Sequence, residues 1–255
     1  MIIELIAPAK LTLGLRITGR RDDGYHFIDA EMVSLDLHDI LTIDTSLIER
    51  GHVGLSVVGP YAPGVPVDET NLVDRALRLV GRRAHVTIDK RIPHGGGLGG
   101  GSSDAAAVLR WGGVTDPTAA AVIGADVAYC LVGGRARVRG IGDIVDPLPY
   151  VERAVTLVVP PLSVSTPAAY RAWDDLGGPT MQGANDLEPA AIAVAPELAR
   201  WRDRIGELSG QRPILAGSGA TWFVHGQHSN TLAVLSDEGA MVVAAHTVPA
   251  AGIPA

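Results

Sequence analysis

Short runs of branched aliphatic residues, separated by clusters of turn-forming residues, fill the first 60 positions of the chain. Such runs predict β-strands, because β-branched side chains pack well on a pleated surface. The predicted strands cover 2–6, 11–17, 30–37, 39–44 and 53–58, with a polar loop over 18–24. The chain therefore begins with a predicted sheet.

Helical spacing begins near residue 70. Apolar residues at 72, 73, 76, 77 and 80 form the stripe that a helix over 69–82 would bury. The elements predicted next are a strand over 85–89, a glycine-rich loop over 95–101, helices over 103–111 and 119–132, and strands over 135–139 and 144–145.

Prolines flank the following predicted strand, at 154–159, and the pattern of the sequence changes there. We therefore expect two lobes, residues 1–150 and 151–255, that meet near 147–153. The second lobe is predicted to contain helices over 167–173, 185–194, 196–208 and 229–237, strands over 214–215, 221–224 and 241–246, and a frayed tail over 249–255. The mixture of strands and helices predicts an α/β (α+β) fold.

Composition narrows the classes of protein to which the chain can belong. Hydrophobic residues make up 47% of the 255 residues and charged residues 19%, which excludes a disordered chain. The single cysteine, Cys130, excludes a disulfide framework and a Cys-rich zinc site, and it suits a reducing cytoplasm. The net charge of −7 argues against a nucleic-acid partner.

Neither a secretory signal nor a membrane span is predicted. The start of the chain has no basic segment before its apolar residues. The longest stretch without a charged residue or a histidine, 154–170, contains prolines and falls short of the ~20 apolar residues that a membrane helix needs. We expect a soluble cytoplasmic protein without a membrane partner.

Lysine is rare in this chain, since only Lys10 and Lys90 occur among 21 lysine and arginine residues. Arginine supplies neither a compact point charge nor a readily shifted pKa. A position that stays lysine in an arginine-rich chain is therefore a candidate for function.

The strongest functional signal is the segment 92–107, which follows a predicted strand and leads into an alanine-rich helix. Six of the seven residues from 95 to 101 are glycine, so backbone N–H groups can approach a ligand closely. The N-terminus of the helix adds unpaired N–H donors and a partial positive charge, which together predict a phosphate cradle. Its candidate residues are Pro93, His94, Gly95, Gly96, Gly97, Leu98, Gly99, Gly100, Gly101, Ser102 and Ser103.

Three other interpretations of this loop fit less well. A flexible linker would not be held between Pro93 and a helix. A Walker A loop ends in Gly-Lys-Ser/Thr, whereas Gly100 is followed by Gly101 and Ser102. The glycine spacing also matches a dinucleotide-binding pattern, but the helix leads into a turn and a second predicted helix instead of a strand that ends in an acidic residue.

Residues 93–106 resemble the phosphate loop of the GHMP small-molecule kinases, which has the form Pro-x-x-x-Gly-Leu-Gly-x-x-Ser-Ser-x-Ala-Ala. Other segments resemble the branch of that family whose substrate is a cytidine-diphosphate conjugate. They are 7–13, 19–26 with its Asp-Gly-Tyr-His box, 124–127, 165–170, 185–188 and 215–221. The matches follow the family's order and cover most of the chain.

The resemblance implies a two-lobed fold with the active site between the lobes. It implies ATP and Mg²⁺ as cofactors and a small-molecule cytidine-diphosphate conjugate of methylerythritol as substrate. The γ-phosphoryl group would move to the 2-hydroxyl of the erythritol part, a step of non-mevalonate isoprenoid (terpenoid) biosynthesis. A monomer or a homodimer is expected, and no residue is assigned as a dedicated metal ligand.

Lys10 and Asp126 are the candidate catalytic residues. Asp126 belongs to a mostly apolar segment, 119–131, in which an isolated buried carboxylate would be costly. The resemblance implies that Asp126 accepts the proton of the substrate hydroxyl, or mainly orients that hydroxyl, since phosphoryl transfer has a loose transition state. It also implies that Lys10 keeps Asp126 negatively charged and stabilises charge that develops on the hydroxyl.

The resemblance also assigns residues to binding. Tyr25 and Tyr170 would enclose the cytosine ring while His26 hydrogen-bonds its edge. The residues that would face the substrate diphosphate or the γ-phosphate are Gly217, Ser218 and Gly219. Asn71 and Lys90 match positions near adenine, with a helix cap and a surface charge as the alternatives.

Three further assignments concern single positions. Ser102 and Ser103 are expected to cap the helix after the glycine loop. Asp104 is expected to face away from the phosphates, because its charge would repel them. His225 and His228 have metal-like spacing without a third ligand nearby, and we interpret them as loop histidines.

The chain departs from the family pattern near both candidate catalytic residues. Thr12 stands where the family has asparagine, and Ala128, Tyr129 and Cys130 stand where proline and aromatic residues are usual. Two alternatives therefore stay open. One is a kinase of the same class for another small alcohol, such as a mevalonate- or homoserine-like one. The other is a nucleotide-binding protein without turnover.

Overall fold

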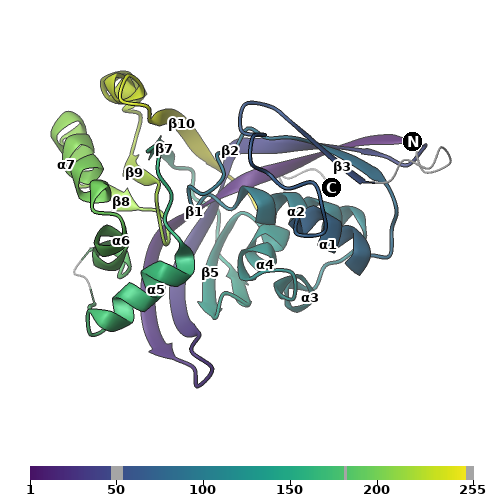
Figure 1. The fold of residues 1–255 in the computed structure, drawn as a ribbon, viewed down its shortest axis with the longest axis horizontal. Coiled ribbons are helices and arrows are strands. Elements are labelled where there is room, and N and C mark those ends of the chain that lie inside the picture. The colour runs from purple at the N-terminus through teal and green to yellow at the C-terminus, as the bar shows by residue number, and fades with distance from the viewer. Residues whose placement is uncertain (47–53, 181–182, 251–255) are drawn as a thin grey trace.

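A computed structural model describes residues 1–46, 54–180 and 183–250. Two long antiparallel strands, β1 (Ile2–Arg20) and β2 (His26–Asp44), run through the middle of the molecule (Figure 1). The sequence predicts four shorter strands here, and this prediction is wrong. The β1–β2 ladder continues across both expected breaks. The register of the pairing shifts between Pro8 and Lys10 and between Thr12 and Gly14, and the strands stay paired on both sides of each shift.

Ten strands of the described chain form one sheet around β2. β2 pairs with β1, β4 (His85–Asp89), β5 (Arg135–Gly140) and β10 (Met241–Val248). On the first-lobe side, β3 (Gly54–Val58) pairs with β4, and β6 (Ile144–Pro147) pairs with β5. On the second-lobe side, β7 (Ala154–Val159) pairs with β10 and β9 (Trp222–His225), and β8 (Ile214–Leu215) pairs with β9.

The helices of the first lobe lie together beside the β1–β2 ribbon (Figure 1). They are α1 (Leu72–Leu79), α2 (Gly100–Trp111), α3 (Pro117–Ala121) and α4 (Ala125–Val132). Asn71 and Asp116 cap α1 and α3 with side-chain oxygens, as start signals of this kind predict. The single helix predicted over 119–132 is wrong, because the backbone of Gly124 is extended between α3 and α4.

The second lobe packs its helices around a core of its own, at the other end of the molecule (Figure 1). These helices are α5 (Thr166–Asp175), α6 (Glu188–Val194), α7 (Glu197–Ser209) and α8 (Ser229–Leu232). The core contains Trp201 of α7 and Trp222 of β9. The helix predicted over 229–237 is α8 followed by a short 3₁₀ helix (Ala233–Ser236).

A separate core cluster joins the two lobes. It contains Leu11 of β1, Leu98 of the glycine loop, Leu157 of β7 and Phe223 of β9, each at most 1% exposed. Full burial of one such side chain stabilises the fold by about 1.5–3 kcal/mol, so separation of the lobes is costly. β10 adds a backbone connection, since it pairs with both β2 and β7. The domain boundary near 147–153 stays a prediction.

The first residue of the predicted strand 53–58 and positions 251–255 of the predicted tail lie outside the described residues. In the part of the chain that the structure covers, no helix is both long and apolar enough to cross a membrane.

Candidate functional site

The glycine loop leads from the end of β4 into α2. Gly95, Gly97 and Gly99 have φ angles of 77°, 79° and 67°, in the left-handed region that side chains disfavour. Gly99 is the N-cap of α2, and no side chain caps this helix. The prediction that Ser102 and Ser103 cap α2 is therefore wrong: both lie inside its first turn, which leaves the N-terminal N–H groups for a ligand.

Tight packing holds this loop in place. A Cβ atom at Gly97 would lie 2.7 Å from the carbonyl oxygen of Gly219. The side chain of Leu98 is buried in the core cluster that joins the lobes, and its carbonyl oxygen accepts a hydrogen bond of 2.9 Å from the N–H of Lys10. The loop is thus fastened both to β1 and to the second lobe.

Lys10 and Asp126 meet beside the glycine loop. Nζ of Lys10 lies 3.4 Å from Oδ2 of Asp126 and donates a 3.3 Å hydrogen bond to Oγ1 of Thr12. Two of the three irregularities of the β1–β2 ladder flank the segment 10–12, and such bulges redirect side chains. Lys10 is 5% exposed, so its ammonium group is held with little freedom.

Asp126 lies in the first turn of α4, where the positive end of the helix dipole favours a carboxylate. Its side chain is 42% exposed, so the buried environment expected from its apolar neighbours is wrong. The reason is its place at the start of α4, next to the exposed Ala125, whereas residues 127–131 all lie deeper in the core. An outward carboxylate beside a lysine is open to a substrate hydroxyl.

The residues that depart from the family pattern are buried. Thr12 is 1% exposed and contacts Lys10. Tyr129 donates a 2.6 Å hydrogen bond to the carbonyl oxygen of Gly134, and burial raises the pKa of its hydroxyl. Burial also raises the pKa of the Cys130 thiol to about 12. Tyr129 and Cys130 therefore pack the core behind Asp126.

The turn of Gly217, Ser218 and Gly219 completes the site from the second lobe. A Cβ atom at Gly217 would lie 3.6 Å from Nζ of Lys10 and 3.5 Å from Oγ1 of Thr12. The hydroxyl of Ser218 lies 2.8 Å from that of Thr166 on α5. The structure thus brings this turn, the glycine loop, Lys10 and Asp126 together.

His26 and Tyr170 also meet. Their rings stack with centroids 4.9 Å apart and an interplanar angle of 24°, and Nε2 of His26 lies 2.8 Å from Oδ1 of Asp174. Tyr25, by contrast, is 60% exposed, with the guanidinium group of Arg21 5.2 Å from its ring centroid. The enclosure of a base between Tyr25 and Tyr170 stays a prediction. Sequence reasoning missed Asp174, because only the fold places it beside His26.

Lys90 lies in a buried ion cluster beneath the glycine loop. Its ammonium group contacts Asp39 and lies 2.8 Å from Oδ2 of Asp104. Oδ1 of Asp39 accepts backbone hydrogen bonds from Arg91 and Ile92, which lead into the loop. Burial raises the pKa of Asp104 to about 7. Sequence reasoning missed Asp39, although the rarity of lysine drew attention to Lys90.

Asn71 uses its side-chain oxygen to accept a 2.9 Å hydrogen bond from the N–H of Val73. It therefore acts as the helix cap that the sequence left as an alternative. Whether Asn71 and Lys90 also contact adenine stays a prediction.

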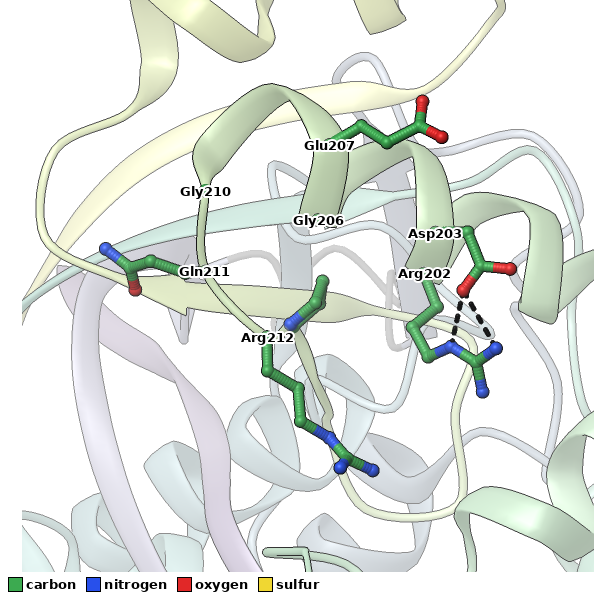
Figure 2. Close-up of a pocket in the computed structure, with 8 residues that line it drawn as sticks. Arg202, Asp203, Gly206, Glu207, Gly210, Gln211 and Arg212 are labelled. Atoms are coloured by element: carbon green, nitrogen blue, oxygen red, sulfur yellow. Dashed lines mark hydrogen bonds and ion pairs between the residues drawn. The ribbon is translucent and has the colours of Figure 1, made fainter.

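A hollow of about 650 Å³ lies on the second lobe, at the C-terminal end of α7 (Figure 2). Its size suits a ligand. However, its arginines are paired, since Arg202 binds Asp203 and both Arg202 and Arg212 lie near Glu188. None of its lining residues belongs to the glycine loop or the Lys10–Asp126 pair. We therefore assign the site to the glycine loop instead.

The chain is similar to proteins of known activity. Residues 71–114 match the family model of the GHMP kinases N terminal domain. A curated relative, the 4-diphosphocytidyl-2-C-methyl-D-erythritol kinase of Paracoccus denitrificans, is 42% identical over 236 residues. This match covers 85% of the present chain and 84% of that protein.

Solved structures agree with this similarity. A crystal structure of 4-(cytidine 5'-diphospho)-2C-methyl-D-erythritol kinase matches with a TM-score of 0.77 at 32% identity, over 96% of this chain and 99% of that chain. A homoserine kinase from Cytophaga hutchinsonii matches with a TM-score of 0.61 at 16% identity, over 97% and 95%. The second likeness shows a shared fold alone.

Proposed function

The chain belongs to the 4-diphosphocytidyl-2-C-methyl-D-erythritol kinases of the GHMP class, and we propose that it carries out the reaction for which that family is named. It transfers the γ-phosphoryl group of ATP to the 2-hydroxyl of 4-diphosphocytidyl-2-C-methyl-D-erythritol, in non-mevalonate isoprenoid biosynthesis. The proposal includes a two-lobed enzyme, monomer or homodimer, that acts in the cytoplasm on a small molecule.

One observation carries the proposal: the Lys10–Asp126 ion pair, at 3.4 Å, joins α4 to β1, the strand that is hydrogen-bonded to the glycine loop. The free N–H groups at the start of α2 hold the phosphates of ATP. Asp126 orients the substrate hydroxyl and takes its proton as the phosphoryl group arrives. Lys10 stabilises the negative charge that develops on the substrate hydroxyl during the transfer.

Mg²⁺ is part of the proposal. A nucleotide-bound Mg²⁺ usually keeps water and phosphate ligands and takes one or two oxygens from the protein. The half-buried hydroxyl of Ser102 and the exposed part of the Asp126 carboxylate are such oxygens beside the loop. Among the described residues, no group of three acidic, histidine or cysteine side chains is placed so that it could hold a metal ion. The ion would neutralise phosphate charge.

The function is tested by following ATP consumption with a panel of alcohols. With Mg²⁺ present, we expect rapid turnover of the cytidine-diphosphate conjugate and none of mevalonate or homoserine. Turnover of another alcohol alone would keep the kinase class and reject this substrate. ATP binding without turnover of any alcohol would favour a non-catalytic nucleotide-binding protein.

The nucleotide part of the substrate makes a second prediction. We propose that His26, which contacts Asp174 and Tyr170, hydrogen-bonds the edge of the cytosine ring. CMP is then expected to compete with the substrate at least about tenfold better than UMP. The reason is that uracil reverses the donor and acceptor at two ring positions, and each unpaired buried group costs about 1–3 kcal/mol. Inhibition constants measure this preference.

His26→Ala should raise KM for the cytidyl substrate and abolish the preference for CMP, while KM for ATP stays the same. The matched control is His246→Ala, because His246 also lies near a carboxylate, that of Asp36, but on β10. Equal competition by CMP and UMP in the wild type would contradict the cytosine-binding role.

A further inference from the structure

Asn185 lies between the two lobes, just before α6, and is 1% exposed. Its side-chain amide uses its donors and its acceptor at once. Nδ2 donates to the carbonyl oxygens of Leu215, at 2.8 Å, and Gly217, at 2.6 Å. Oδ1 accepts a hydrogen bond of 2.9 Å from the N–H of Leu187. The amide thus links the start of α6 to the turn that carries Gly217.

The segment around Asn185 is fastened to β1 as well. Leu15 forms a parallel bridge with Asn185. The N–H of Leu15 donates to the carbonyl oxygen of Ala184 at 2.8 Å, and the N–H of Asp186 donates to that of Leu15 at 3.0 Å. The carboxylate of Asp186 adds a hydrogen bond of 3.0 Å from the N–H of Ile17. Asn185 is therefore fixed to the strand that carries Lys10.

The other side of the Gly217 turn faces the candidate active site. Gly217 lies against Lys10 and Thr12, and the carbonyl oxygens of Ala216 and Gly219 lie against Gly97 of the phosphate loop. A displacement of the turn would change its distance to Lys10 and to the loop together. Asn185 is a buried side chain that is hydrogen-bonded to this turn, in a segment whose backbone is hydrogen-bonded to β1.

We propose that Asn185 is a positioning residue, which holds the Gly217 turn of the second lobe at its working distance from Lys10 of the first lobe. The amide suits this role because it donates two hydrogen bonds and accepts one within the volume of a small side chain. Aspartate has nearly the same shape but cannot donate, so it would place a carboxylate against two carbonyl oxygens. This role rests on the proposed kinase function.

Asn185→Asp and Asn185→Ala test the proposal. We expect both to lower kcat by about tenfold or more, because small displacements at an active site have effects of this size, while KM for ATP changes little. Hydrogen exchange of the backbone amides at 214–221 should become faster in both variants. This second readout needs no substrate, so it remains valid if the proposed reaction fails the alcohol panel.

Asp186→Asn is the matched control. Asp186 is equally buried in the same segment, and its carboxylate binds Arg16 and Ile17 of β1. We expect it to lower the unfolding temperature while kcat and the exchange at 214–221 stay near wild type. Equal losses of kcat in the Asn185 and Asp186 variants would overturn the proposal, because general loosening between the lobes would then explain both. Unchanged exchange at 214–221 in Asn185→Asp would overturn it independently.

Discussion

Replacing Asp126 by asparagine is expected to lower kcat by ~10²–10⁴, the usual contribution of a group that accepts a proton during the reaction. Asparagine keeps the size of the carboxylate but takes no proton. It also removes the charge that lies 3.4 Å from Nζ of Lys10. The side chain is 42% exposed, and asparagine keeps an oxygen that can face Nζ of the buried Lys10, so the fold should survive. Steady-state kinetics at saturating ATP measure the loss.

Asp74→Asn is the matched control for this substitution. Asp74 also lies in the first turn of a helix and pairs with a cation, since Arg78 lies 2.6 Å away, but it is on α1. The control is expected to keep the wild-type kcat, and thermal unfolding should show both variants folded. Turnover by Asp126→Asn within a few-fold of wild type would assign the proton acceptor to another group.

Replacing Gly99 by alanine is expected to weaken ATP binding ~30-fold or more. The left-handed backbone at φ 67° costs about 1–2 kcal/mol for a residue with a Cβ atom. The added atom would also lie 2.5 Å from Cγ of Lys10, near the root of that side chain, and overpacking of this kind costs about 1–3 kcal/mol. Together these costs correspond to the expected loss of affinity. Calorimetric titration with ATP measures it.

Gly206→Ala provides the control for adding one methyl group. Gly206 lies inside α7, where its Cβ atom would be at ordinary contact distances of 3.5 Å or more. Alanine there should leave ATP affinity unchanged and stabilise the helix, because glycine is a poor helix former. Wild-type ATP affinity in a folded Gly99→Ala variant would show that the loop does not hold the phosphates.

Local signals predicted the elements that depend on neighbours along the chain. The helix expected over 103–111 is α2, and that expected over 196–208 is α7, which differ from the prediction by a few terminal residues. The continuity of β1 and β2 was not predictable in this way. It comes from a ladder that pairs Pro8 with His38, and such pairing is formed only when distant segments meet.

In the candidate site, too, some features depend on adjacent residues and others on distant segments. The glycine loop could be predicted from the sequence, because backbone freedom and the following helix are properties of adjacent residues. The rarity of lysine singled out Lys10 and Lys90 alike. The fold gives the two lysines different surroundings: Lys10 lies beside a half-exposed carboxylate, whereas Lys90 is enclosed by Asp39 and Asp104. Burial and charge partners depend on segments far apart in the chain, and these become neighbours only in the folded protein.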